Sequence, residues 1–383
     1  MESLASANVH FSLELFKKIS EINKTGNVFY SPLSISSALA MVCLGARGNT
    51  EAQMHKSLNL HKVEDDVHVG FSKLFAELNK EGTPYALSLA NRLYGEQSLQ
   101  FVEKYLADTK THYCAELETV DFRTNAEAAR VNINKWVEEK TQDKIVDLLA
   151  QGVLDVDTRL VLVNAIYFKG NWDKKFKSIQ TKKVQFKLNK NESKPVKMMH
   201  QKAKFPFTYI PDAECQILEL PYVGKDLSML IMLPNEMEDN TTGLEKLEQM
   251  LTYENFVEWT KPDMMDTVEV QVGLPKFKLE EEYDLKEILV SMGMTDAFNE
   301  SKCDFSGMSP CDDLVLSNVV HKSFVEVNEK GTKAAATTAV VASNSFSNSK
   351  PPPKRFMADH PFLFFIRHNP TQSVLFYGRY SSP

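Results

Sequence analysis

The sequence has little of several features that would assign a protein to a specialised class. Its 383 residues contain 5 cysteines, 15 glycines and 16 prolines, too few for a collagen-like, low-complexity or disulfide-dense chain. No Cys-x-x-Cys pair occurs, so neither a zinc ribbon nor a thioredoxin-type redox centre is indicated. The longest apolar runs fall far short of the roughly 20 residues that a membrane-spanning helix needs. With 43% hydrophobic residues and a net charge of −7, we expect a soluble, mildly acidic protein with a packed core.

Motifs for catalysis and cofactor binding are also missing. The chain has no Gly-x-Ser-x-Gly, no His-Glu-x-x-His, no Walker-type Gly-Lys-Ser/Thr loop and no Gly-x-Gly-x-x-Gly. Its 9 histidines are dispersed and show no metal-ligand spacing. These absences predict a protein that is not an enzyme and that holds neither a cofactor nor a metal.

The cysteines and the N-terminus bear on the cellular compartment. The cysteines are odd in number and widely scattered, at Cys43, Cys114, Cys215, Cys303 and Cys311. Cys303 and Cys311 are close enough in sequence to pair, but we interpret all the cysteines as reduced thiols. The first residues, Met-Glu-Ser-Leu, have neither the basic region nor the apolar core of a signal peptide. We therefore expect a cytoplasmic protein, which could still leave cells without a cleaved signal peptide.

Periodicity and capping residues predict several helices. Apolar residues from 11 to 22 recur at helical spacing, as on one face of an amphipathic helix. Ser31 followed by Pro32 is typical of a helix start, and the apolar residues continue to position 44. Thr124 and Glu127 have the spacing of a capping box and predict the start of another helix.

Other segments are typical of strands. Residues 160–168 form a continuous β-branched and aromatic run, as expected for a strand buried on both faces. Residues 268–279 alternate like half-exposed strands, and residues 362–367 and 374–377 flank a turn near the C-terminus. Helices and strands interleave without βαβ regularity, which predicts a single α+β domain over residues 1–383.

One long segment between the strand-like runs has an unusual composition. From Thr332 to Ala342 nearly every side chain is small, and in a strand Lys333 would point away from the face that Thr332 shares with the next small residues. Residues 343–355 are rich in Ser and Asn, contain three prolines, and include one large apolar residue, Phe346. Long loops without secondary structure are uncommon in compact domains. The segment is therefore either a connecting linker or short helix, or a protease bait whose first half can become a strand.

Several long motifs in the same order make the sequence similar to the serpins, and among them to the ovalbumin-type intracellular group. These motifs occupy residues 27–35, 164–172, 218–222, 321–332, 360–364 and 376–379. The resemblance extends essentially from end to end. It implies an α+β fold with three β-sheets, about nine surrounding helices and an exposed reactive-centre loop at about residues 329–356.

The resemblance also implies a function. Serpins are suicide inhibitors: a serine protease cleaves the loop and becomes covalently trapped, and the first half of the loop then inserts into the central sheet. The expected partner is thus a target serine protease, bound by a monomer with no membrane association. Two alternatives stay open, namely a non-inhibitory serpin-fold storage or interaction protein, and an inhibitor of papain-like cysteine proteases.

Matching positions assign roles to particular residues, none of them catalytic. The loop hinge comprises Glu329, Gly331, Thr332, Ala334, Ala335, Ala336 and Thr338. The cluster where the central strands part comprises Ser31, Ser34, Asn164 and His321, although buried polar groups that only satisfy one another are an alternative interpretation. The region where the loop first enters the sheet comprises Trp172, Lys276 and Glu329.

The position of the scissile bond is less clearly indicated by the sequence than the residues of the loop hinge. Counting along the loop as in the family places it between Ser345 and Phe346, and a shift by one residue places it after Phe346. Cleavage after Val341 or Ala342 would suit an elastase. Together these positions favour an elastase- or chymotrypsin-like target over a trypsin-like one.

A basic run extends from Lys174 to Lys204. It contains eleven lysines and one acidic residue, Glu192. Such a run could bind a polyanion weakly, or it could be only a solvated face on alternating strands.

Overall fold

The computed structural model describes residues 1–235, 240–331 and 351–383. In these residues the helices are α1 (Glu2–Ile22), α2 (Pro32–Cys43), α3 (Gly48–Ser57), α4 (Val67–Leu78), α5 (Glu103–Tyr113), α6 (Phe122–Lys140), α7 (Glu245–Met250), α8 (Tyr253–Thr260) and α9 (Lys286–Ser291). The strands are β1 (Val28–Tyr30), β2 (Ala86–Glu96), β3 (Leu117–Val120), β4 (Leu160–Lys169), β5 (Lys182–Lys187), β6 (Ser193–Ile210), β7 (Cys215–Pro221), β8 (Leu227–Pro234), β9 (Asp266–Pro275), β10 (Phe277–Asp284), β11 (Leu316–Val327), β12 (Lys354–Met357), β13 (Phe362–His368) and β14 (Ser373–Tyr380).

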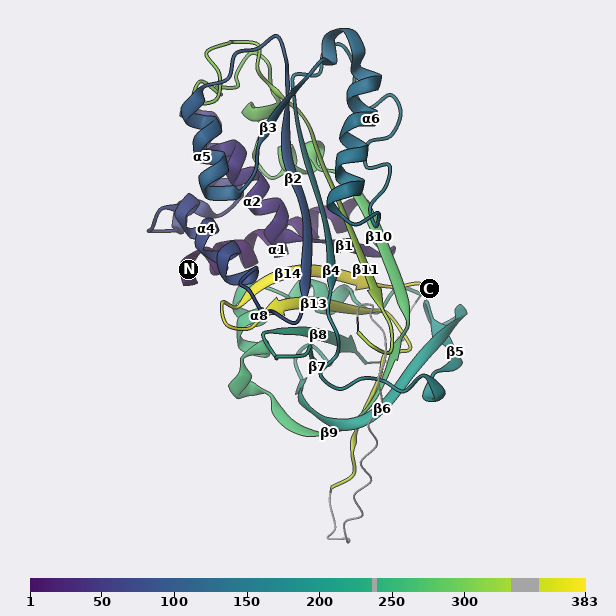
Figure 1. The fold of residues 1–383 in the computed structure, drawn as a ribbon. Helices are drawn as coiled ribbons and strands as arrows, with labels where there is room; N and C mark the ends of the chain where they lie inside the picture. Colours follow the sequence, from purple (N-terminus) through teal and green to yellow (C-terminus); the bar gives the residue numbers. More distant parts are fainter. Residues whose placement is uncertain (236–239, 332–350) are drawn as a thin grey trace.

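A five-stranded sheet runs along the length of the molecule in the order β10-β11-β4-β2-β3 (Figure 1). Its two central neighbours, β4 and β11, run parallel to each other, whereas β10 and β2 pair with them in the antiparallel sense. Parallel neighbours cannot be joined by a tight turn, and here a long stretch of chain separates them. The centre of this sheet is therefore a contact between segments that lie far apart in the sequence.

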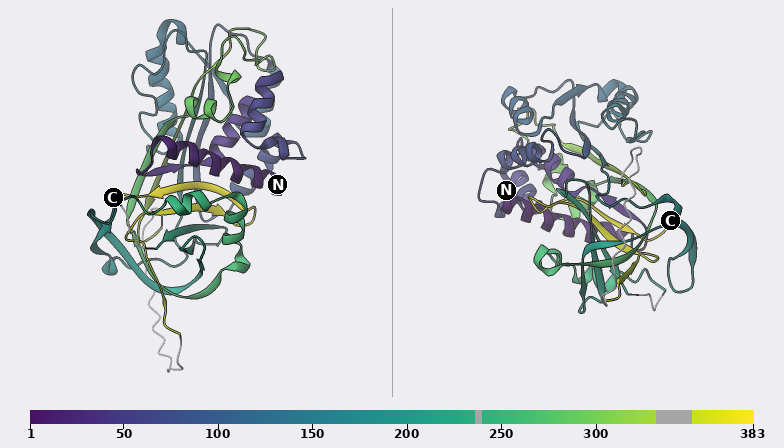
Figure 2. Two further views of the ribbon diagram at one scale, coloured as in Figure 1. Left: turned by 180° about the vertical axis from the view of Figure 1, so that it is seen from behind. Right: turned by 60° about the horizontal axis from the view of Figure 1, so that its bottom comes forward.

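Strand β4 is buried on both faces. Leu160, Leu162 and Ile166 belong to the main core, which includes residues of α1 and α2. Val161 and Val163 face a second hydrophobic cluster that contains residues of α6. The sheet thus lies between α6 on one face and the N-terminal helices on the other, and Figure 2 shows α1 lying across the back of the molecule. This double burial explains why the run at 160–168 is continuous instead of alternating.

The remaining strands form a nine-stranded network in the order β1-β14-β13-β8-β7-β6-β9-β12, with β5 paired to β6. Strand β6 is 18 residues long. One part of it pairs with β5 and β9, and its last residues pair with β7. Two of the three sheets expected for the fold are therefore continuous through β6.

Most of the predicted elements are confirmed, with one correction. Ser31 caps α2 by accepting from the Ser34 amide, as predicted. The capping box at Thr124 was wrong: α6 begins at Phe122, and Asp121 Oδ1 accepts from the Thr124 amide at 2.9 Å. An aspartate three residues earlier supplies the cap, and the helix is kinked at Asn125.

Three further findings concern the described part of the chain. It contains no helix long and apolar enough to cross a membrane. It also contains no group of three or more His, Cys, Asp or Glu residues placed to hold a metal ion. All five cysteines lie in described segments and are free thiols.

Candidate functional site

A central polar cluster, defined as Ser31, Ser34, Asn164 and His321, lies where β4 meets β11 and the start of α2. Asn164 on β4 is directly opposite His321 on β11 in the parallel ladder. His321 Nδ1 lies 2.6 Å from Asn164 Oδ1, and Ser34 Oγ donates to the same oxygen at 2.8 Å. All four residues are buried. The structure therefore brings together all four residues that the sequence assigned to the parting strands.

The bonds of His321 determine its tautomer. The Ser31 amide donates to His321 Nε2 at 3.1 Å, so Nε2 accepts and the ring proton lies on Nδ1. Nδ1 can then donate to Asn164. Complete burial lowers the pKa of His321 from 6.5 to about 3, because a charged ring would lose its hydration. The imidazole is therefore neutral at neutral pH, as a ring with one donor and one acceptor must be.

This cluster joins three elements across the central contact of the sheet. Separating β4 from β11 would break the bond between Asn164 and His321 and leave buried donors and acceptors without partners. Each such unpaired group costs about 1–3 kcal/mol. The arrangement fits a polar contact that must break and re-form if the sheet opens, and that role stays a prediction.

A second cluster, the loop-base cluster, lies where β11 ends and comprises Glu329, Lys276, Thr181, Trp172 and Phe176. Lys276 Nζ is 3.0 Å from Glu329 Oε2, and Thr181 Oγ1 donates to Glu329 Oε1 at 2.8 Å. The Phe176 amide donates to the Glu329 carbonyl at 2.9 Å. The side chain of Glu329 is 10% exposed. Partial burial alone would raise the pKa of Glu329, but the bonds from Lys276 and Thr181 outweigh it and hold the pKa below its usual value.

Trp172 holds the backbone on both sides of Glu329. Its indole Nε1 donates to the Asn328 carbonyl at 2.9 Å, and its amide donates to the Lys330 carbonyl at 3.0 Å. The indole stacks on Tyr222 with ring centroids 4.6 Å apart. The chain that leaves β11 is therefore attached through three successive carbonyls before the loop begins.

Gly331 is the last described residue before the loop. Its φ of 115° lies in the region that favours glycine. A Cβ at this position would come within 2.5 Å of the Gly170 carbonyl oxygen and 2.6 Å of the Trp172 nitrogen. Gly331 also forms a bridge with Asn171, two residues beyond the end of β4. The loop thus starts where the ends of β4 and β11 lie side by side.

The other predicted loop residues lie outside the described residues. These are Thr332, Ala334, Ala335, Ala336, Thr338, Ser345 and Phe346. The hinge assignment beyond Gly331 and the reactive bond therefore remain predictions from the sequence.

Sequence reasoning missed one buried charge near the central cluster. Lys322 follows His321 and points to the opposite face of β11. Its Nζ donates to the Val146 carbonyl at 3.1 Å and lies 2.9 Å from Glu280 Oε1 on β10. Lys322 is 9% exposed. The only signal in the sequence was a lysine within an apolar strand. In the structure Lys322 links β11 to the segment that follows α6.

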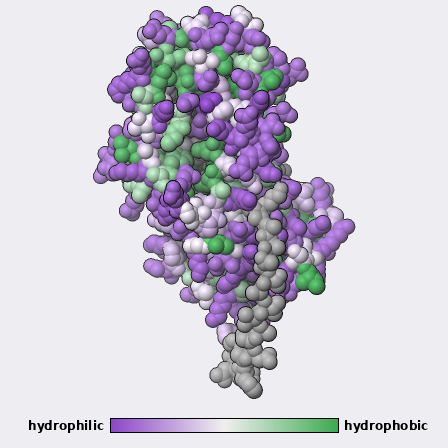
Figure 3. Space-filling view, in the orientation of Figure 1, coloured by the Kyte–Doolittle hydropathy of each residue, from purple (hydrophilic) through white to green (hydrophobic). Residues whose placement is uncertain are grey.

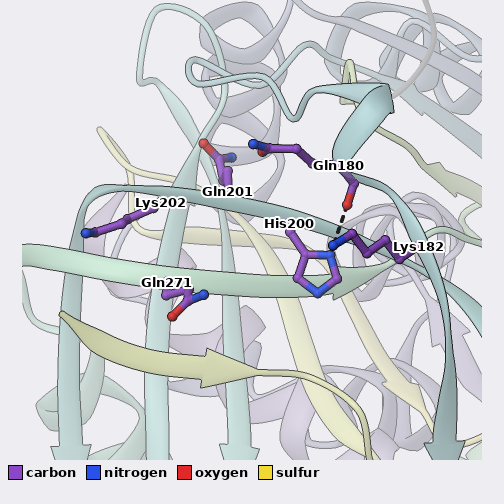
Figure 4. A pocket seen from close by; sticks show the side chains of 6 residues that line it. All are labelled: Gln180, Lys182, His200, Gln201, Lys202 and Gln271. Atoms are coloured by element: carbon purple, nitrogen blue, oxygen red, sulfur yellow. Dashed lines mark hydrogen bonds between the residues drawn. The ribbon is translucent and has the colours of Figure 1, made fainter.

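The lysines between Lys174 and Lys204 gather on the β5–β6 hairpin and the segment before it. Two of them, Lys182 and Lys202, line a surface hollow of about 260 Å³ together with Gln180, His200, Gln201 and Gln271 (Figure 4). Figure 3 shows mostly hydrophilic residues on the part of the surface over this hairpin.

Comparison with known protein families gives a match over almost the whole chain. The profile of the serpin family, described as serine protease inhibitors, matches residues 6–383. Leukocyte elastase inhibitors are similar over their full length: the Bos taurus protein is 56% identical and the Homo sapiens protein 54% identical, each over 383 residues. Both matches cover 100% of this chain and 100% of the relative.

Solved structures agree with this result. Uncleaved ovalbumin is 36% identical with a TM-score of 0.89, and the match covers 100% of both chains. A crystal structure of maspin is 37% identical with a TM-score of 0.91, covering 100% of this chain and 99% of that one.

Proposed function

Because the chain belongs to the serpin family of serine protease inhibitors, we propose that it traps elastase- or chymotrypsin-like proteases through cleavage of its own loop. The serine of the protease forms an ester with the carbonyl at the cleaved bond, and the amine of the C-terminal peptide leaves. The first half of the loop then enters the five-stranded sheet as a new strand between β4 and β11. One molecule of inhibitor is consumed for each protease trapped.

The observation that carries the proposal is the parallel contact between β4 and β11. The loop begins at the end of both strands, so a segment returning from Gly331 would run antiparallel to each. One parallel ladder would then be replaced by two antiparallel ladders. For a strand of about ten residues this adds about ten backbone hydrogen bonds, or on the order of 10 kcal/mol at roughly 1 kcal/mol each.

The composition of the loop supports insertion. Thr332, Ala334, Ala336 and Thr338 would share one face of the inserted strand, and all have small side chains. Lys333 falls on the other face. No large or charged side chain would therefore have to enter the core during insertion.

The choice of target rests on the loop sequence and on the relatives. Cleavage between Ser345 and Phe346 is our first choice, and cleavage after Phe346 is the second. A phenylalanine before the bond would suit a chymotrypsin-like pocket. The relatives that are 54–56% identical are named leukocyte elastase inhibitors, which favours an elastase-like target.

The proposal includes a monomer in the cytoplasm, with release from cells that needs no cleaved signal peptide. The free thiols of all five cysteines suit a reducing compartment. It also includes weak polyanion binding through the segment from Lys174 to Lys204, for which its eleven lysines are the support.

The test is incubation of the intact protein with a panel of elastase-, chymotrypsin-, trypsin- and papain-like proteases. Denaturing gels should show a covalent complex with the first two classes, and the mass of the released C-terminal peptide identifies the cleaved bond. Cleavage without a complex by every protease would contradict inhibition. The thermal stability of cleaved chain then separates the alternatives, because a large rise indicates insertion and no rise indicates a non-inhibitory serpin fold.

A further inference from the structure

A group of charged residues lies at the far end of the five-stranded sheet, where β4 and β11 begin. We define this far-end clasp as Glu96, Arg123, Arg159 and Asp313. Glu96 is the last residue of β2, and Arg123 lies in the first turn of α6. Arg159 directly precedes β4, and Asp313 lies just before β11. The clasp therefore joins the three neighbouring strands β2, β4 and β11 at the end opposite to Gly331.

One carboxylate oxygen is shared by both arginines of the clasp. Asp313 Oδ2 accepts from Arg123 Nη2 at 2.8 Å and lies 3.6 Å from Arg159 Nε. Arg123 Nε in turn lies 3.9 Å from Glu96 Oε2, and the Glu96 side chain is only 1% exposed. The Asp313 side chain is 51% exposed. Acidic and basic side chains thus alternate across the end of the sheet, and Asp313 is the member on the side of β11.

Backbone hydrogen bonds show which contacts cross the boundary between β4 and β11. The Glu96 amide donates to the Arg159 carbonyl at 2.9 Å, so the start of β4 is attached to β2. The Arg159 amide donates to Ser317 Oγ on β11 at 3.0 Å, at a shift of register in the ladder between the two strands. Parting β4 from β11 would therefore break the contacts of Asp313 and Ser317 with Arg159 and keep those of Glu96.

The bridges of Gly331 set the register that an inserted strand would follow. Gly331 forms antiparallel bridges with both Asn171 and Asn328. Each step along an inserted strand moves one residue back along β4 and β11, so its seventh residue after Gly331 would pair with Asn164 and His321. In the same register its eleventh residue would pair with the first residue of β4. A half-length insertion thus ends at the central polar cluster, whereas a full insertion reaches the far-end clasp.

We propose that the far-end clasp restrains the last part of loop insertion, and that Asp313 is a positioning residue that keeps the starts of β4 and β11 together in the uncleaved protein. The proposal rests on the insertion step of the proposed function and adds the residues that regulate its completion. Completion requires Arg123 and Arg159 to release Asp313. The clasp therefore affects the fraction of cleaved chain that completes insertion before water hydrolyses the ester to the protease.

Two synthetic peptides with the sequences of residues 332–338 and 332–342 test this restraint in the intact chain. Each can occupy the place of the inserted strand, but only the longer one reaches the far-end clasp. Native gels measure the rate at which each peptide is incorporated. Asp313→Asn should incorporate the longer peptide about fivefold faster, a modest effect because the ion pairs are partly exposed. It should incorporate the shorter peptide at the rate of the parent.

Glu116→Gln is the matched control on the same sheet. Glu116 lies 3.6 Å from Arg92, and the two side chains are 56% and 17% exposed. These values are close to the 51% and 17% of Asp313 and Arg159. The control pair joins β2 to the residue before β3, and these strands do not part, so both peptides should enter at the rate of the parent. An unchanged rate for the longer peptide in Asp313→Asn, or equal acceleration of both peptides, would overturn the proposal.

Hydrogen exchange of the uncleaved protein tests the clasp independently of insertion. Asp313→Asn should speed exchange in proteolytic fragments that contain the starts of β4 and β11, and should leave fragments near Gly331 unchanged. Exchange at the far end that matches the parent would overturn the assignment of the clasp. Failure of both peptides to enter the parent chain would instead contradict the proposed insertion itself, and with it any role of the clasp in insertion.

Discussion

The central polar cluster and the loop-base cluster stand at two points on the same strand, β11, yet they are built from different chemistry. The central cluster is fully buried and neutral, and His321 takes part in it as an uncharged ring. The loop-base cluster uses an ion pair in which the Lys276 side chain is 34% exposed. The contact deep in the sheet, which we propose must break during insertion, is therefore expected to respond weakly to salt and strongly to acid. The contact near the surface should respond to both. The following predictions probe the two clusters and the loop between them.

We expect the largest effect from a substitution that blocks insertion of the loop between β4 and β11. Thr332→Arg places a charge on the face that must enter the core, so insertion should stall and most of the variant should be cleaved without trapping the protease. Denaturing gels measure the covalent complex. Lys333→Glu changes a charge on the outward face and should keep normal complex formation. Undiminished complex in Thr332→Arg would contradict the insertion step.

Asn164→Ala should destabilise the protein by about 3 kcal/mol. The substitution leaves the His321 Nδ1 proton and the Ser34 hydroxyl without their shared acceptor in a buried site. Urea denaturation of the intact inhibitor measures the loss. Asn132→Ala, at an exposed position on α6, is the control and should change stability by less than about 0.5 kcal/mol.

Acid should weaken the central cluster first. Folding lowers the pKa of His321 from 6.5 to about 3, so the unfolded chain binds one more proton between these values. Stability should fall by about 1.4 kcal/mol per pH unit as the pH drops below 6.5. His321→Gln should remove this part of the slope. An identical slope in both proteins between pH 6.5 and 5 would contradict the neutral assignment.

Gly331→Ala should destabilise the base of the loop by about 2 kcal/mol. Alanine is strained at a φ of 115°, and its Cβ would also meet the Gly170 carbonyl. Gly82→Ala separates the two causes, since Gly82 has a φ of 82° with no atom within 4 Å of a new Cβ. The control should cost about 1 kcal/mol in thermal denaturation. Equal losses would show that the contact with Gly170 contributes nothing.

The smallest expected effect is that of Glu329→Gln, at about 1 kcal/mol. The estimate is modest because Lys276 is partly exposed and solvent screens the pair. The pKa of Glu329 is lowered in the folded state, so its contribution is present above the ordinary pKa of a glutamate and is lost as the pH falls through the lowered value. In 1 M NaCl the difference between parent and variant should shrink. Glu258→Gln, which breaks an exposed pair with Lys261, should have almost no effect.

The sequence predicted a large part of the fold because local patterns are sufficient for local elements. The helix cap at Ser31 and the strand at residues 160–168 follow from residue types and spacing alone, and both are confirmed. The capping box at Thr124 failed because an aspartate three residues earlier competes for the same amide. Two valid caps in one short segment cannot be ranked without the geometry of the helix start.

Only some of the residues of the candidate site were predicted from the sequence. The residues of the central cluster were named from the resemblance, and the structure places all four in contact. Lys322 and Thr181 were missed, because a lysine in a strand and a threonine in a connecting segment carry no local signal of their partners. Their roles depend on which segments lie against them.

The sequence by itself determined the chemistry of the loop, the helix and strand periods and the family to which the chain belongs. It could do so because side-chain size, capping and motif order are properties of neighbouring residues. Only the tertiary structure decided that Asn164 and His321, 157 residues apart, share one hydrogen bond, and that Lys183 faces Lys197. Strand order and register arise from long-range pairing, and a shift of one residue would turn every one of these side chains to the other face.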